Sequence, residues 1–144
     1  MEEITRRSAL TIGLATAAAT PLFALVTPAG AAEIVPTYGP NDGTEIAPGV
    51  RIVEVGKWDS DMTGIKSIQI LDAVFQPGAA DKESVMDNDM VCTITAGAFT
   101  IKKVDKEFKL KVGDMYTCAK GKTDEATNTS NEVGVHRIAV LIPA

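Results

Sequence analysis

Short alternating segments separated by turn-forming residues constrain the fold of this chain most. Apolar, β-branched and aromatic residues alternate with polar ones in these segments, and glycine, proline or aspartate lies between them. The segments span residues 51–55, 65–75, 90–95, 99–101, 106–112, 115–118 and 135–142. No amphipathic stripe with helical period extends beyond two turns after Ala31. The pattern therefore predicts an all-β sandwich or barrel.

The first 31 residues differ from the rest of the chain. Arg6 and Arg7 precede an uncharged run over residues 9–26, and small residues occupy positions 29–31. This order is typical of a signal peptide, and the paired arginines are similar to a twin-arginine export signal, although Ala9 stands where an aromatic residue is usual. We expect cleavage after Ala31 rather than an uncleaved anchor, because alanine and threonine make the run a poor membrane span. The sequence thus predicts export to the periplasm or the exterior.

Charge restricts the partners of the mature chain. The 144 residues carry a net charge of −5, and removal of residues 1–31 takes away two arginines and two glutamates, which leaves this charge unchanged. No basic run remains, so we expect no nucleic-acid partner and, after cleavage, no membrane partner. Residues 32–48 are rich in turn formers and predict an extended arm. Residues 49–144 are then one barrel domain.

Two glycine-spaced segments carry the most specific signal. Residues 77–97 begin with Pro77 and Gly78 and end at Gly97, and residues 113–128 run from Gly113 to Asn128. This spacing resembles the two motifs of the cupin superfamily over residues 77–128, and the strand layout agrees over residues 50–142. The resemblance implies a double-stranded β-helix, that is, a jelly-roll barrel. Glycines of this kind suit sharp turns between strands, whether or not a metal is bound.

The resemblance also indicates where a metal would be bound in a typical cupin. Its three imidazoles and one carboxylate correspond here to Ser84, Met86, Met90 and Asp124. Iron, manganese and zinc sites need several imidazoles and carboxylates, so we expect no metal cofactor. We expect a pocket that binds a small, partly apolar ligand. The predicted pocket residues are Ser84, Met86, Met90, Cys92, Ile94 and Asp124.

An alternative prediction is a metal-independent enzyme. The resemblance implies that Asp124 projects into an apolar barrel, where burial disfavours the charged form of a carboxyl group. Asp124 would then be a general acid or base for an isomerisation, tautomerisation or elimination, with Tyr116 or His136 at the rim. The competing interpretations are that Asp124 binds a backbone amide or solvent, and that His136 is a strand-edge residue.

Sulfur-containing residues allow a third interpretation. Met86, Met90 and Cys92 could share one face and bind copper(I), which prefers thioethers and thiolates. The alternative is that the methionines fill the vacated metal pocket. The resemblance places Cys92 and Cys118 on adjacent strands, where a disulfide and two buried thiols remain equally open.

Two further segments carry expectations. The acidic cluster at Asp81, Glu83, Asp87 and Asp89 lacks the glycine and distal glutamate of a calcium loop, which favours a solvated turn. Residues 68–75 are apolar on both faces, so the second face should also be covered. Either a second copy of the chain or the proline-rich arm could supply that cover.

Overall fold

The computed structural model describes residues 37–144, which belong to one compact unit, and it contains ten strands and no helix over this range. The expected signal peptide, residues 1–31, lies outside the described residues. The strands are β1 (Thr44–Ala47), β2 (Val50–Asp59), β3 (Ile65–Phe75), β4 (Ala80–Val85), β5 (Asp89–Ala96), β6 (Ala98–Lys102), β7 (Glu107–Lys111), β8 (Met115–Cys118), β9 (Thr123–Asn128) and β10 (Gly134–Pro143). Within residues 37–144, no helix is long and apolar enough to cross a bilayer.

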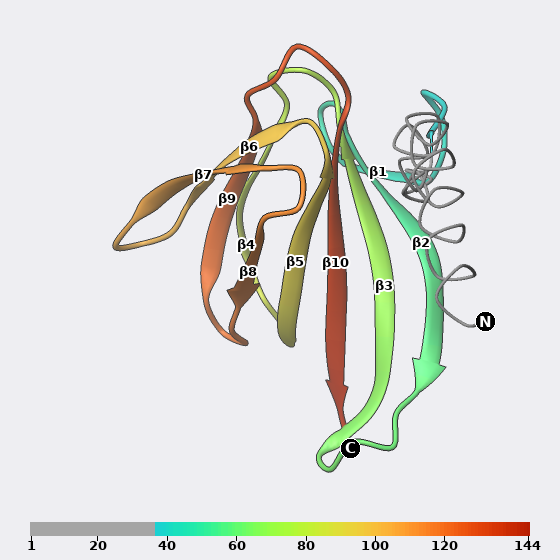
Figure 1. Ribbon diagram of the computed structural model, residues 1–144. Helices are drawn as coiled ribbons and strands as arrows, with labels where there is room; N and C mark the ends of the chain where they lie inside the picture. The colour runs from blue at the N-terminus through green and yellow to red at the C-terminus, as the bar shows by residue number, and fades with distance from the viewer. Residues whose placement is uncertain (1–36) are drawn as a thin grey trace, which may run out of the picture. The chain divides into compact units, whose positions relative to one another are not determined.

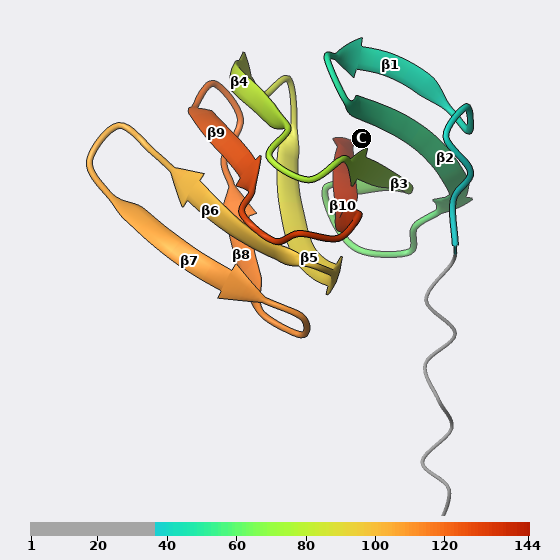
Figure 2. The same ribbon diagram turned by 90° about the horizontal axis from the view of Figure 1, so that it is seen from above.

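Two antiparallel sheets form the domain (Figure 1). The larger has the strand order β1-β2-β3-β10-β5-β8, and the smaller has the order β4-β9-β6-β7. After β3, every connection except the β6–β7 hairpin carries the chain from one sheet to the other. The view from above shows the smaller sheet on the left, next to β5 and β8, and the strands β1, β2, β3 and β10 of the larger sheet on the right (Figure 2). This alternation produces the jelly-roll barrel that the sequence predicts.

The hydrophobic core lies between the inner faces of the two sheets. Phe75 from the larger sheet and Phe99 from the smaller meet edge to face, with ring centroids 5.1 Å apart. Such aromatic pairs contribute about 0.5–1.5 kcal/mol beyond the area that they bury. The other buried residues of this core are Val50, Ala73, Ile94, Ile101 and Ala126. This core closes one end of the space between the sheets.

Glycines make the sharp turns that the motif spacing predicts. Gly97 joins β5 to β6 with φ of 75°, and Gly113 lies between β7 and β8 with φ of 90°. A Cβ atom at Gly97 would also come within 2.8 Å of the Cα atom of Gly134. Positive φ and close backbone approach therefore both select glycine at position 97.

All seven predicted strand segments are strands, but three strands were not predicted. β1 lies within the expected extended arm. β4 and β9 are mostly polar and lack the alternation of apolar and polar residues on which the strand predictions relied. Asp81 lies in β4 and pairs with Ala126 of β9, so the solvated-turn interpretation is wrong there. Pairing supplies the backbone hydrogen bonds that polar residues need in a sheet.

The outer face of β3 carries a buried charge. Asp72 is fully buried, and it accepts two hydrogen bonds from the Arg137 guanidinium, at 2.8 and 2.7 Å, and one from the Tyr38 hydroxyl. Burial and the Asp72 carboxylate raise the pKa of Tyr38 to about 12, so Tyr38 remains a donor. The proline-rich arm was one of the two segments expected to cover this face, and its residue Tyr38 does contact Asp72 there. Cover by a second copy of the chain remains a prediction.

Candidate functional site

A cavity of about 320 Å³ lies between the two sheets beyond the core. Its wall on the larger sheet is mainly apolar and includes Ile52, Leu71, Ile138 and Val140. Strands β4 and β9 and the loop between β4 and β5 line it from the other side. The cavity therefore has an apolar wall and a polar end.

Strand register explains which side chains form the apolar wall. Leu71 of β3 lies opposite Ile138 of β10, and Ile138 lies opposite Cys92 of β5. Two residues further along β10, Val140 lies opposite Met90 of β5. Since every second residue of a strand faces the same side, these residues all face the cavity.

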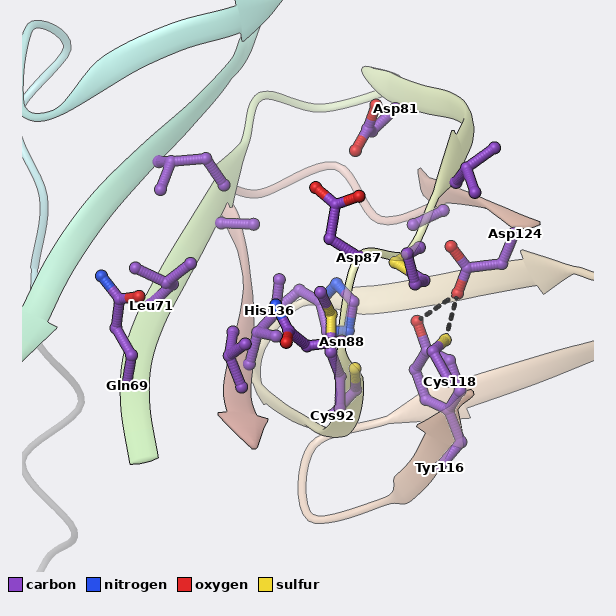
Figure 3. A pocket seen from close by; sticks show the side chains of 18 of the residues that line it. Gln69, Leu71, Asp81, Asp87, Asn88, Cys92, Tyr116, Cys118, Asp124 and His136 are labelled. Atoms are coloured by element: carbon purple, nitrogen blue, oxygen red, sulfur yellow. Dashed lines mark hydrogen bonds between the residues drawn. The ribbon is translucent and has the colours of Figure 1, made fainter. Parts of the chain in front are cut away.

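The polar end is centred on Asp124 of β9 (Figure 3). Its Oδ2 atom accepts hydrogen bonds from the Tyr116 hydroxyl at 3.1 Å and from the Cys118 thiol at 2.7 Å. Both of these hydrogen bonds go to the same oxygen atom, and the Asp124 side chain is buried. Two donors thus fix the carboxylate through Oδ2 at the edge of the cavity.

Aromatic contacts hold Tyr116 in place. Its ring stacks on the His136 ring with centroids 5.5 Å apart, and it meets the edge of Phe108 at 5.6 Å. Burial is the largest cause that raises the pKa of Tyr116, and the neighbouring acidic groups raise it further. Tyr116 therefore keeps its proton and donates it to the hydrogen bond with Asp124.

His136 lies deep in the domain. Its side chain is only 5% exposed, and its Nε2 atom has no hydrogen-bond partner among the described residues. The expectation of a strand-edge position is wrong, because β10 lies between β3 and β5 in the larger sheet, and the expectation of a rim position is wrong, because His136 is buried. His136 lines the cavity, where an unpaired buried nitrogen marks a place for a hydrogen-bonding partner.

The two cysteines are free and buried on adjacent strands, so the structure has two thiols rather than the alternative disulfide. The hydrogen bond with Cys92, burial and the Asp124 carboxylate raise the pKa of Cys118. The interaction with the neighbouring Cys118 side chain lowers the pKa of Cys92 to about 5 against the effect of burial, with a further contribution from His136. Cys118 is therefore the thiol that holds its proton.

Four of the six predicted pocket residues line this cavity: Met86, Met90, Cys92 and Asp124. Ile94 is fully buried in the hydrophobic core and does not line the cavity. Ser84 pairs with Asp124 through the backbone, but its side chain lies outside the described part of the structure. Sequence reasoning missed the apolar wall on β3 and β10, although the apolar run over residues 65–75 could have indicated it.

The donor groups at this site do not fit the divalent metal of a typical cupin. Of the ligand positions whose side chains are described, Met86 and Met90 offer weak thioether donors, and only Asp124 offers a carboxylate. Among the side chains that the structure describes, no group of three or more histidine, cysteine, aspartate or glutamate residues is arranged to hold a metal ion. Iron, zinc and manganese sites use several imidazole and carboxylate ligands.

Comparison with solved structures defines the fold class. The domain is similar to KdgF from Halomonas sp., with a TM-score of 0.56 and 17% identity over 69% of this chain and 87% of that one. It is also similar to the Cupin_2 domain of an XRE family transcriptional regulator from Enterobacter cloacae, with a TM-score of 0.56 and 15% identity over 67% of this chain and 99% of that one.

A further similar structure is described as a sugar phosphate isomerase from a cupin superfamily, from Silicibacter pomeroyi. Its TM-score is 0.53, and the identity is 17% over 66% of this chain and 60% of that one. No family model matches the sequence, and no curated protein matches it. The protein therefore has a jelly-roll fold of the cupin type, and at these identities the likeness shows the fold alone.

Proposed function

We propose that this protein is exported and binds a small, partly apolar molecule in its barrel without a divalent metal. The observation that carries the proposal is the unpaired Nε2 atom of His136, which is buried at the cavity beside an apolar wall. A buried polar atom without a partner costs about 1–3 kcal/mol. A ligand that supplies the missing hydrogen bond would recover this free energy.

The cavity limits the chemistry of the ligand. Its volume of about 320 Å³ suits a small organic molecule, and most of its wall would contact an apolar body. Asp81, Asp87 and Asp124 line the polar side, so their negative potential disfavours anionic ligands. We expect a neutral molecule with an apolar body and one end that hydrogen-bonds to His136 Nε2 and Asp124 Oδ1.

Ligand screening with two matched variants tests this proposal. Neutral alcohols, ketones and lactones would be screened by the rise in melting temperature, since a ligand that binds only the folded state stabilises it. Val140 lines the cavity, and the next residue, Leu141, faces the opposite side of the sheet. Val140→Phe should abolish binding, whereas Leu141→Phe should leave it unchanged. Equal binding by both variants would place the ligand outside the cavity.

A second candidate function is proton transfer on the bound molecule. It is favoured by the arrangement at Asp124, where Tyr116 and Cys118 both donate to Oδ2, so that the other oxygen, Oδ1, would act as the base. The proton would move from a carbon or oxygen atom of the ligand to Oδ1, and His136 Nε2 would bind the atom on which charge develops. Asp124→Asn should then abolish turnover of any ligand found in the screen while binding persists. Retained turnover in this variant would exclude Asp124 as the base.

A further inference from the structure

Two cysteines lie side by side on one wall of the cavity. Cys92 of β5 is opposite Tyr116 of β8, and Cys118 of β8 is opposite Met90 of β5. The cysteines are therefore diagonal neighbours on the same face of two antiparallel strands. Both line the cavity, and their side chains are otherwise buried, at 2% and 3% exposed. Both cysteine side chains therefore face a molecule in the cavity.

The surroundings make the two thiols chemically unequal. The Cys118 thiol donates to Asp124 Oδ2 at 2.7 Å, and a thiolate beside that carboxylate would be disfavoured. Cys92 has no carboxylate hydrogen-bonded to its sulfur among the described contacts, and the neighbouring Cys118 side chain and the His136 imidazole both favour its thiolate. The thiolate is the nucleophilic form of cysteine, so Cys92 is the more reactive of the two.

We propose that Cys92 and Cys118 reduce a small, neutral hydroperoxide, with Cys92 as the nucleophile and Cys118 as the resolving thiol. This activity is independent of the ligand proposed above. A neutral oxidant is favoured because Asp81, Asp87 and Asp124 line the cavity and repel anions. The cavity has a volume of about 320 Å³, so we expect its substrates to be hydrogen peroxide and small alkyl hydroperoxides.

The first step forms a sulfenic acid. The Cys92 thiolate attacks the distal oxygen of the hydroperoxide, an S–O bond forms and the O–O bond breaks. The sulfur loses two electrons to the peroxide, and the leaving alkoxide or hydroxide takes a proton from solvent. Cys92 then carries the sulfenic acid, and one alcohol or water is released.

The second step forms a disulfide. The Cys118 sulfur attacks the sulfenic sulfur of Cys92, an S–S bond forms and the S–O bond breaks. The Cys118 proton passes to Asp124, which already accepts its hydrogen bond, and then to the leaving hydroxide, which departs as water. One hydroperoxide and two thiols thus give one alcohol or water, a further water and one disulfide. A dithiol reductant would restore the pair by exchange.

The position of β8 favours this second step. Diagonal cysteines must approach each other to form a bond of disulfide geometry. β8 is only four residues long and is the edge strand of the larger sheet, so it has a partner strand on one side only. A small displacement of β8 along β5 would bring the two sulfur atoms together and would disturb no third strand of the larger sheet.

Oxidation of the purified full-length chain tests the proposal. Reduced protein would be treated with one equivalent of hydrogen peroxide, and its thiols would be counted after denaturation. Trypsin separates the two cysteines, because Cys92 falls in the peptide 83–102 and Cys118 in the peptide 112–120. We expect both thiols to be lost together and the two peptides to be joined by a disulfide within one chain. Untouched thiols, or a disulfide between chains, would overturn the proposal.

Variants assign the two roles. In Cys118→Ser, Cys92 should form a sulfenic acid that dimedone labels, and this labelling should be at least about tenfold faster than that of Cys118 in Cys92→Ala. Dimedone is needed because Met86 and Met90 lie in the same peptide as Cys92, and their sulfoxides add the same mass of oxygen. Asp124→Asn should slow the disulfide step but not the labelling of Cys92. Faster labelling of Cys118 would refute the assignment. If a variant does not fold, thiol loss and disulfide formation in the unmodified chain still test the proposal.

Discussion

Removal of Arg137 tests the physical account of the larger sheet most directly. Asp72 on β3 is fully buried, and its two carboxylate oxygens lie 2.8 and 2.7 Å from Arg137 nitrogens. Arg137→Met keeps most of the aliphatic length but leaves the Asp72 charge with Tyr38 as its remaining partner. Loss of one partner from a buried ion pair costs about 3–5 kcal/mol. Because the Arg137 side chain is 35% exposed, solvent compensates in part, and we expect about 2–3 kcal/mol.

Urea denaturation of the variants would measure this cost. Arg137→Met should lower the denaturation midpoint without changing the slope, since the surface exposed on unfolding is unchanged. Asp72→Asn removes the charge that needs a partner, so the Asp72→Asn, Arg137→Met double variant should be more stable than the sum of the two single losses predicts. Additive losses would show that the two side chains are not coupled, which would refute the reasoning. Leu141→Phe on the same outer face is a control that leaves this pair intact.

Four further predictions concern other parts of the molecule. The protein purified without an affinity tag should contain far less than one equivalent of iron, manganese, zinc or nickel, as elemental analysis would show; a stoichiometric metal held by Met86, Met90 and Asp124 would contradict the donor-set argument. Gly97→Ala should destabilise the fold by at least about 1–3 kcal/mol, measured by urea denaturation, because position 97 has φ of 75° and lacks room for a Cβ atom. The pKa of Cys92 is lowered to about 5, so its contribution to stability should be present above the pKa of the unfolded thiol and be lost as pH falls through about 5; a Cys92→Ala variant should lack this dependence in melting curves from pH 9 to pH 4. N-terminal sequencing of the exported protein should begin at Ala32, and a full-length chain retained in the membrane would contradict this.

The sequence predicts the barrel well because the fold depends on turns and on apolar alternation. Gly97 and Gly113 are required by backbone conformation, so their spacing is visible in the sequence. The polar strands β4 and β9 were missed, since they are held by pairing with each other and with β6 rather than by an apolar face of their own. β4 and β9 form strands because they pair with partners that are distant in the sequence, and the local sequence pattern does not contain this information.

The site could be predicted only in part. The motif spacing indicated Met86, Met90 and Asp124, which line the cavity together. His136 is distinguished by its central position in the sheet, which follows from strand order, and by its unpaired Nε2 atom, which depends on the side chains packed around it. Sequence alternation reports which face a residue occupies, but it does not report which strand becomes its neighbour.

The place of β10 has a consequence for how the molecule acquires its structure. β10 follows the other nine strands in the chain, yet it pairs with β3 on one side and β5 on the other in the middle of the larger sheet. Until it is in place, β3 and β5 present two unpaired edges, which are the surfaces that aggregate most readily. Nascent or truncated chains that lack β10 should therefore be substrates for chaperones and proteases. Folding should occur late, in one cooperative and slow step dominated by contacts between distant segments.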